Sequence, residues 1–202
     1  MLVEADTVPA NRDSVDSLIT GLKRIEFGSL PSSSVGALLQ SARLDHADLR
    51  PYLDFDDIRY TRNLIFRNDH FELLALCWPL GSSSAVHDHG GKQAYMTVHS
   101  GSLTFEDFFI MTGGKREGYA QVAPAASGIL TPGLVDVRSS DLDLHRVSAP
   151  NERAISLHVY AKPLDRYMVF NPETRSCRTV FAHYDSVPAS PVLLSEPARS
   201  TP

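Results

Sequence analysis

The sequence predicts a mainly β protein, a sandwich or barrel preceded by N-terminal helices. Beyond Pro51, short runs rich in β-branched and aromatic residues are separated by turn residues, and hardly any long helical period is present. Many short strands in series are typical of a β-sandwich or barrel. Among them, Ser100 and Gly101 separate the apolar runs 94–98 and 103–109, which predicts a hairpin.

The first fifty residues are expected to be helical and to serve in packing. After the candidate caps Asp13 and Ser14, apolar residues follow at helical spacing: Val15, Leu18, Ile19, Leu22 and Ile25. A second helix is expected to begin in the serine run 32–34 and to use Val35, Leu38, Leu39 and Ala42. We expect His46, in a polar stretch beyond it, to be exposed.

The β region that follows supplies the strands of a single domain. The strand candidates are 58–66, 71–79, 93–99, 102–111, 117–123, 127–130, 142–148, 153–161, 166–170 and 176–183. We expect one domain over residues 1–185, with its helical part at about 12–50. The proline- and serine-rich residues 186–202 are expected to form a flexible tail.

The composition is that of a soluble globular protein. The 202 residues are 43% hydrophobic and carry a net charge of −5, so we expect no nucleic acid and no anionic membrane surface as partner. The N-terminus lacks the basic region and apolar run of a signal peptide, and no stretch approaches a membrane span. Two cysteines, Cys77 and Cys177, form no disulfide framework. A monomer in a reducing cytoplasm is the expectation.

Two histidines one residue apart form the most informative motif. On a β-strand alternate residues share a face, so His87 and His89 would point the same way. Two imidazoles on one face can bind one metal ion, although a metal normally needs a third protein ligand. From Gly81 to Gly101 the stretch GSSSAVHDHGGKQAYMTVHSG resembles the first motif of the cupins, jelly-roll β-sandwiches or barrels. It departs from that motif at Ala94, where cupins have a glutamate ligand.

A third candidate ligand lies in the segment LDLHRVSAP. Taken alone, a strand histidine such as His145 is more often a hydrogen-bonded core or surface residue. Cupins, however, return one histidine from a second motif to the same metal, and His145 is the best placed for that. The competing His99 falls at the end of the hairpin.

Two further strands carry polar side chains on one face. Tyr60 and Arg62 share a face, and a guanidinium in a partly enclosed pocket would bind a carboxylate with both prongs. A solvated arginine at a strand edge is the alternative. Ser156, His158 and Tyr160 also share a face, directed either to solvent or to an internal cavity. In a cavity they could form a hydrogen-bonded chain that orients the Tyr160 hydroxyl.

The segments YTRNLIF, LLALCWPLGSSSAVHDH, LHRV and ISLHVYAKPLD resemble, in this order, the successive motifs of the cysteine dioxygenases, thiol-oxidising members of the cupin superfamily. The resemblance extends from about Tyr60 to about Phe170. It implies a mononuclear Fe(II) held by three neutral histidines, His87, His89 and His145. It also implies that L-cysteine, or a related small thiol, reacts with O2 to give cysteine sulfinic acid.

The resemblance further implies a role for each polar residue of the two strands. Arg62 matches the family residue that binds the substrate carboxylate, and Tyr60 matches its neighbour in the pocket. Tyr160 matches the tyrosine whose hydroxyl reaches the ligands of the iron, with His158 and Ser156 behind it as a relay.

Two departures from the family pattern bear on the site. Animal members have a cysteine that crosslinks to the active-site tyrosine, but Ala94 stands in its place, so Tyr160 is expected to be unmodified. The family's Ser-Pro-Pro after this tyrosine reads Ala161, Lys162, Pro163. No cis X-Pro bond is possible at Lys162, and the local fit to the substrate is affected.

Other functions remain open at the level of sequence. Related enzymes that oxidise 3-mercaptopropionate carry glutamine in place of Arg62, so Arg62 favours cysteine. A cupin that binds metal or a thiol without turnover, or a non-redox cupin that uses zinc or manganese, has the same histidine spacing. The joint presence of Arg62, His158 and Tyr160 favours the enzyme, because a mere metal binder does not need them.

Overall fold

The structure, a computed structural model, describes residues 13–27, 33–114, 116–138 and 143–188. Helices come first in the chain: α1 (Val15–Lys23), α2 (Ser33–Ser41) and α3 (His46–Leu49), followed by the 3₁₀ turn η1 (Arg50–Tyr52). The predicted N-terminal helices are thus confirmed. The beginnings predicted at residues 12 and 32 for the helices, and at 142 for a strand, lie outside the described residues.

Side chains at the helix ends explain where two helices begin. Ser14 caps α1, because its hydroxyl oxygen accepts a hydrogen bond of 3.1 Å from the Ser17 amide. Asp45 caps α3 in the same way, accepting from the Ala47 amide at 3.0 Å. Most of the predicted apolar face of α1 is buried, namely Val15, Leu18, Ile19 and Leu22.

The strands of the described residues follow the helices. They are β1 (Thr61–Arg67), β2 (Phe71–Trp78), β3 (Val86–His87), β4 (Gln93–Ser100), β5 (Leu103–Gly113), β6 (Gly118–Leu130), β7 (Val135–Arg138), β8 (Leu144–Ser148), β9 (Ala154–Ala161), β10 (Arg166–Asn171) and β11 (Ser176–Phe181). The pairings between them are antiparallel. The prediction of a mainly β fold is confirmed.

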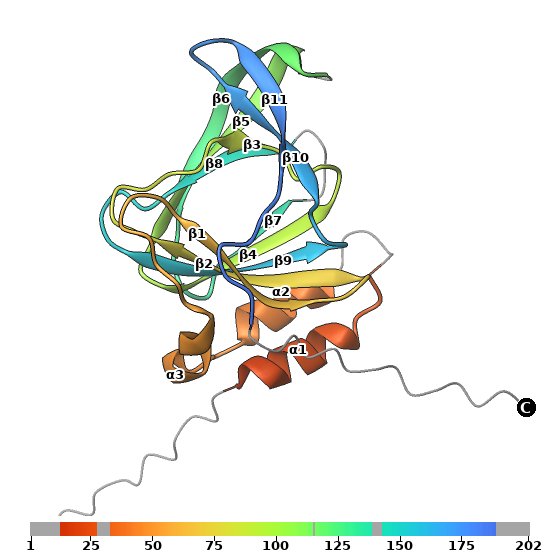
Figure 1. Cartoon of the computed structure of the whole chain (residues 1–202), viewed down its shortest axis with the longest axis vertical. Helices are drawn as coiled ribbons and strands as arrows, with labels where there is room; N and C mark the ends of the chain where they lie inside the picture. Colours follow the sequence, from red (N-terminus) through yellow and green to blue (C-terminus); the bar gives the residue numbers. More distant parts are fainter. Residues whose placement is uncertain (1–12, 28–32, 115, 139–142, 189–202) are drawn as a thin grey trace, which may run out of the picture.

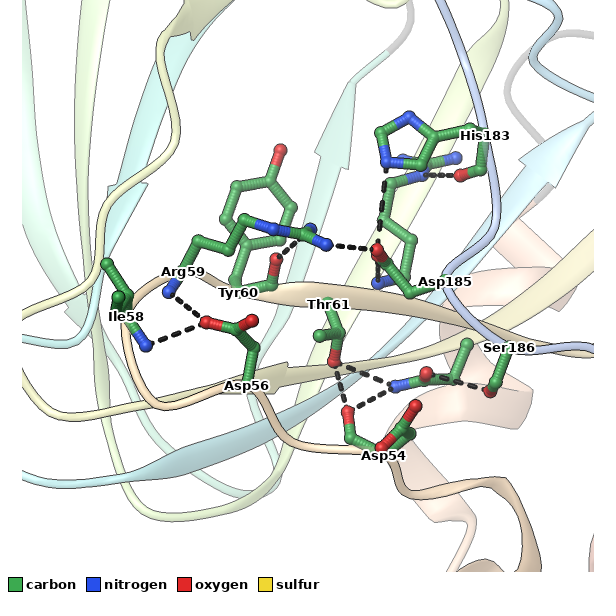
Figure 2. A network of polar contacts seen from close by, with 11 residues as sticks. Asp54, Asp56, Ile58, Arg59, Tyr60, Thr61, His183, Asp185 and Ser186 are labelled. Atoms are coloured by element: carbon green, nitrogen blue, oxygen red, sulfur yellow. Dashed lines mark hydrogen bonds and ion pairs between the residues drawn. The ribbon is translucent and has the colours of Figure 1, made fainter.

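Four strand predictions differ from the structure. The strand expected to carry both His87 and His89 ends at His87, so His89 lies beyond it. The separate strands predicted at 117–123 and 127–130 are one strand, β6, because a bulge opposite Glu106 and Phe108 lets the strand continue past Pro124. The strand predicted from residue 58 begins only at Thr61, since the Asp56 carboxylate accepts from the amides of residues 58 and 59 and holds a turn there (Figure 2). The short strand β7 was not predicted, and four residues of mixed polarity carry little periodicity.

The strands form two sheets (Figure 1). One has five strands in the order β1-β2-β9-β4-β7. The other six, in the order β10-β11-β6-β5-β8-β3, close into a barrel because β3 pairs back onto β10. The helices lie beside the five-stranded sheet, below β2 and β4 in the view of Figure 1.

Strand alternation divides the core at the five-stranded sheet. In β2, Phe71, Leu73 and Ala75 pack with the helices. Their neighbours Leu74, Leu76 and Trp78 point to the opposite face and pack with residues of the other sheet, such as Leu103 and Val147. The same alternation directs Leu157 and Val159 of β9 to the helices. The polar residues between them in β9 therefore face the interior between the sheets.

The C-terminal end of the described chain is attached to the first strand. Ser186 was predicted to begin a flexible tail, but its carbonyl accepts from the Leu64 amide at 3.0 Å and its hydroxyl donates to Asn63 at 2.8 Å. The predicted tail thus begins too early, and residues 189–202 lie outside the described part. Cys77 and Cys177 are both free and buried. Among the described helices, none has the length and apolar character needed to cross a membrane.

Candidate metal and substrate site

Three histidines converge between the sheets. His87 in β3 is the register partner of His145 in β8, and His89 follows β3. One nitrogen of each ring lies within 4.8 Å of those of the others. The ring centroids are 4.7 Å apart for His87 and His145, 4.9 Å for His89 and His145, and 5.3 Å for His87 and His89. The three histidines predicted from the sequence are therefore brought together.

The turn after His89 fixes its direction. The Asp88 carboxylate accepts from the Met168 amide at 2.8 Å and from the Gly90 amide at 3.1 Å, so this side chain is tied to the neighbouring strand β10. Gly90 has φ +55°, and a Cβ there would lie 2.3 Å from the carbonyl oxygen of Arg166. Only glycine fits this close approach, which lets the chain turn directly after the second histidine.

The histidines are held in the neutral form that a metal requires. Desolvation lowers the pKa of His87 to about 4, and burial lowers the pKa of His89 and His145 well below the usual value. The Nδ1 of His87 is 2.9 Å from the Ala85 carbonyl oxygen, so its proton lies there and Nε2 is left as a ligand. The Nδ1 atoms of His89 and His145 are buried and have no hydrogen-bond partner in the part of the chain that the structure describes.

This donor set fits a transition metal. Three neutral imidazoles suit iron, zinc, copper or nickel. Among the described residues no carboxylate joins the cluster, and the position of the cupin glutamate is held by Ala94, which is buried in β4. Asp136 in β7 lies 3.6 Å from Nδ1 of His145 and accepts from Arg138 at 2.9 Å. It was not singled out in the sequence, because β7 itself was not predicted.

Arg62 and Tyr60 line the same pocket as His87 and His145. The Arg62 side chain is 6% exposed, and its buried Nη2 has no hydrogen-bond partner among the described residues. Its Cζ lies 5.6 Å from the ring centroid of Tyr160. The solvated arginine that the sequence left open as an alternative is therefore excluded, and a buried cation is directed to the site.

The polar face of β9 also lines this pocket through His158 and Tyr160. The Trp78 indole donates to the Ser156 hydroxyl at 2.9 Å, and that hydroxyl is 2.8 Å from Nε2 of His158. The Ser156 hydroxyl accepts from the indole and makes a second hydrogen bond with Nε2 of His158, in which either group can be the donor. Burial lowers the pKa of His158 to about 3.

The predicted chain from Ser156 to Tyr160 is made only in part. In the described residues no hydrogen bond continues from His158 to Tyr160, whose rings are stacked with centroids 6.2 Å apart. Burial raises the pKa of Tyr160, and the charge of Arg62 opposes this. The charge of Arg62, and not the His158 imidazole, is therefore the neighbouring group with the largest influence on the pKa of the Tyr160 hydroxyl.

Sequence reasoning missed two aromatic residues of the pocket. Trp78 stacks on Tyr60 with ring centroids 4.6 Å apart. Tyr167 lies edge-on to His87 at 5.7 Å. Trp78 could have been found, since it shares strand parity with Leu76 and therefore faces the interior. Tyr167 lies in β10, where the two faces of the strand carry residues of similar polarity. The sequence of β10 therefore does not predict which face points into the pocket.

Two antiparallel sheets with three histidines converging between them, placed to bind one metal ion, have the architecture of the cupin class. The family model described as "Cysteine dioxygenase type I" matches residues 7–173. The chain belongs to this family.

Curated relatives agree with this membership. Cysteine dioxygenase type 1 of Danio rerio is 30% identical over 172 residues, which cover 83% of this chain and 84% of the relative. The protein of the same name from Homo sapiens is 30% identical over 143 residues, 69% of this chain and 70% of the relative. Among solved structures, a cupin 2 conserved barrel domain protein from Leptotrichia buccalis has a TM-score of 0.42 and 16% identity, covering 57% of this chain and 47% of that one.

Proposed function

We propose that the chain is an iron-dependent thiol dioxygenase that oxidises L-cysteine with O2 to cysteine sulfinic acid. The observation that carries this proposal is the buried Nη2 of Arg62, which makes no hydrogen bond in the described residues and lies in the same pocket as two of three converging histidines. A metal site alone needs no such cation. Membership of the cysteine dioxygenase family supports the same reaction.

The metal proposed for His87, His89 and His145 is a mononuclear Fe(II). Ferrous iron bound there would supply stabilisation of the thiolate and redox chemistry with O2. Three neutral ligands leave the full charge of the ion uncompensated, which favours an anionic thiolate. The low pKa values of the histidines support this role, because the imidazoles carry no proton that competes with the metal at neutral pH.

Arg62 is the proposed partner of the substrate carboxylate. The planar guanidinium can bind a carboxylate through two parallel hydrogen bonds, and burial strengthens that interaction. Tyr60 is proposed to add a hydroxyl beside it. Since burial raises the pKa of Tyr160, its hydroxyl stays protonated at neutral pH and can donate a hydrogen bond to the reacting groups. His158 and Ser156, which are hydrogen-bonded to each other, are proposed to fix the position of the pocket lining next to Tyr160.

The proposed reaction balances without a further reductant. The thiol R-SH takes up both atoms of one O2 molecule and becomes the sulfinic acid R-SO2H. The sulfur is oxidised by four electrons and O2 is reduced by four. The protein must therefore bind the thiol and O2 next to each other, and no electron donor site is needed.

Metal analysis followed by product analysis tests the proposal. Purified protein supplied with Fe(II) is expected to hold iron and to release cysteine sulfinic acid while it consumes oxygen. Oxygen consumption with L-cysteine and with 3-mercaptopropionate is compared side by side. Preference for 3-mercaptopropionate would overturn the choice of substrate, whereas bound metal without any sulfinate would identify a non-catalytic cupin. We also propose a cytoplasmic monomer, as expected from the sequence.

A further inference from the structure

The edge strand β1 is covered by the C-terminal segment of residues 183–186. β1 is the last strand of the five-stranded sheet, so β2 is its one partner among the described strands and the backbone groups on its outer side face away from the sheet. The Asp185 amide donates to the Arg62 carbonyl at 2.8 Å, and the Leu64 amide donates to the Ser186 carbonyl at 3.0 Å. Asn63 and Ser186 form a parallel bridge. Figure 1 shows the segment after β11 passing beside β1.

Arg62 is bound by this segment at three points. Besides the bond to its carbonyl, its amide donates to the Asp185 carboxylate at 2.8 Å, and its Nε donates to the His183 carbonyl at 3.2 Å. Figure 2 shows Asp185 between Arg59 and His183, with the Arg59 guanidinium 2.6 Å from its carboxylate. The backbone and the side chain of Arg62 are thus both oriented by residues more than a hundred positions away, while Nη2 makes no hydrogen bond to a described residue.

Tyr184 anchors the same segment in the interior. Its hydroxyl donates to the Glu72 carboxylate and accepts from Arg67 Nη1 at 2.6 Å. Burial and the bond to Glu72 raise the pKa of Tyr184 to about 12, so the phenol remains a donor at neutral pH. Glu72 has no exposed surface. A carboxylate this deeply buried needs several partners, and Tyr184 is one of them.

Glu72 extends from Tyr184 toward Arg62. In β2 it alternates with the residues that pack on the helices, and it is the register partner of Tyr160 in β9. Its Oε1 accepts from the Leu164 amide at 3.1 Å and lies 3.9 Å from Nη2 of Arg62. At this distance the two charges attract each other, but Nη2 and Oε1 are too far apart to form a hydrogen bond. Glu72 thus orients the Arg62 guanidinium, and the N–H groups of Nη2 can still donate to a substrate.

We propose that residues 183–186 position Arg62 for the carboxylate of the thiol substrate, with Asp185 as the outer anchor and Tyr184 on Glu72 as the buried anchor. Tyr184, Asp185 and Glu72 are positioning residues, since they act through Arg62. The proposal rests on the carboxylate-binding role given to Arg62 in the proposed function.

Binding of two thiols tests this proposal. Iron-loaded protein is titrated without oxygen with L-cysteine and with cysteamine, which is the same thiol without its carboxylate. Tyr184→Phe and Asp185→Asn are expected to raise the Kd of L-cysteine about tenfold. The Kd of cysteamine should stay within about twofold of the wild-type value. Under turnover, KM for L-cysteine should rise while kcat changes little.

A matched control is Asp57→Asn, which removes an exposed carboxylate from the same loop as Arg59, 3.5 Å from Arg153. It should alter neither Kd. Unchanged binding of L-cysteine in both variants, or an equal loss for both thiols, would refute the positioning role. If circular dichroism shows that Asp185→Asn is unfolded, Tyr184→Phe decides alone. Wild-type protein that binds L-cysteine without forming sulfinate would refute the proposed function, and the Kd values would still decide the positioning role.

Discussion

Ala94 is the register partner of Tyr160 across strands β4 and β9. A methyl group therefore stands beside the phenol that lines the metal pocket. No thiol is available at this position to form a crosslink with the ring. The intact mass of the purified protein is expected to equal the sequence mass, without the loss of two hydrogens that a thioether at Tyr160 would cause. Peptide mapping that finds such a loss would contradict the expectation.

Tyr160→Phe removes only the hydroxyl from the pocket. Since burial keeps that hydroxyl protonated, we expect its loss to lower kcat for L-cysteine about 100-fold, with unchanged metal content. Oxygen consumption measures the effect. The control is Tyr119→Phe, which removes a hydroxyl from a tyrosine that is 55% exposed on β6. Full turnover by Tyr160→Phe would exclude a role for the hydroxyl.

Removal of one histidine should empty the metal site. His145→Gln leaves two imidazoles, and we expect the bound metal after gel filtration to fall below about a tenth of the wild-type amount. The matched control is His99→Gln. His99 stacks on His46 at 5.7 Å, outside the cluster of three, so this variant should keep its metal. Equal metal content in both variants would show that the histidine cluster is not the metal site.

Lys162 has the left-handed backbone conformation, with φ +66°. In the described residues no peptide bond is cis, so this turn after β9 is made through φ. Lys162→Gly is expected to be neutral or to stabilise the fold by up to about 1 kcal/mol, because glycine adopts this φ without strain. Lys162→Val should instead lower the free energy of unfolding, because a β-branched residue resists it. Urea denaturation of both variants measures the difference.

The Asp185 carboxylate should make stability depend on pH. Burial opposes its ionisation, but the hydrogen bonds from Arg59 and from the Arg62 amide outweigh burial and lower its pKa. A lowered pKa in the folded state adds stability above the pKa of the unfolded state, and this is lost as pH falls through the folded value. Asp185→Asn is therefore expected to cost about 1 to 2 kcal/mol at pH 7. The difference from wild type should shrink below about pH 4.

Those parts of the site that depend on local strand parity were predictable from sequence. Period two placed Tyr60 with Arg62 and His158 with Tyr160, and these four side chains line one pocket. The direction of Arg62 toward the interior was less certain, because it depends on which face of β1 meets the other sheet.

Contacts between distant segments were not predictable. Glu72 lies in an apolar run, and the partners of its carboxylate, among them the Leu164 amide and Tyr184, arrive from segments about 90 and 110 positions further along the chain. Ser186 was assigned to a tail because its composition is that of a linker, whereas its place beside Asn63 follows from the open edge of β1. His46 was correctly expected to be exposed, but its stacking on His99 depends on how α3 packs beside β4.

The pairing of residues 183–186 with β1 has a consequence for synthesis of the protein. Arg62 and Asp185 are 123 positions apart. At ordinary translation rates Arg62 leaves the ribosome on the order of ten seconds before Asp185 does. Once His145 has also been made, the nascent chain contains the three histidines, yet the edge of β1 stays open to other chains until residues 183–186 follow. The part of the pocket around Arg62 therefore gains the bonds to His183 and Asp185 only when the C-terminal segment emerges.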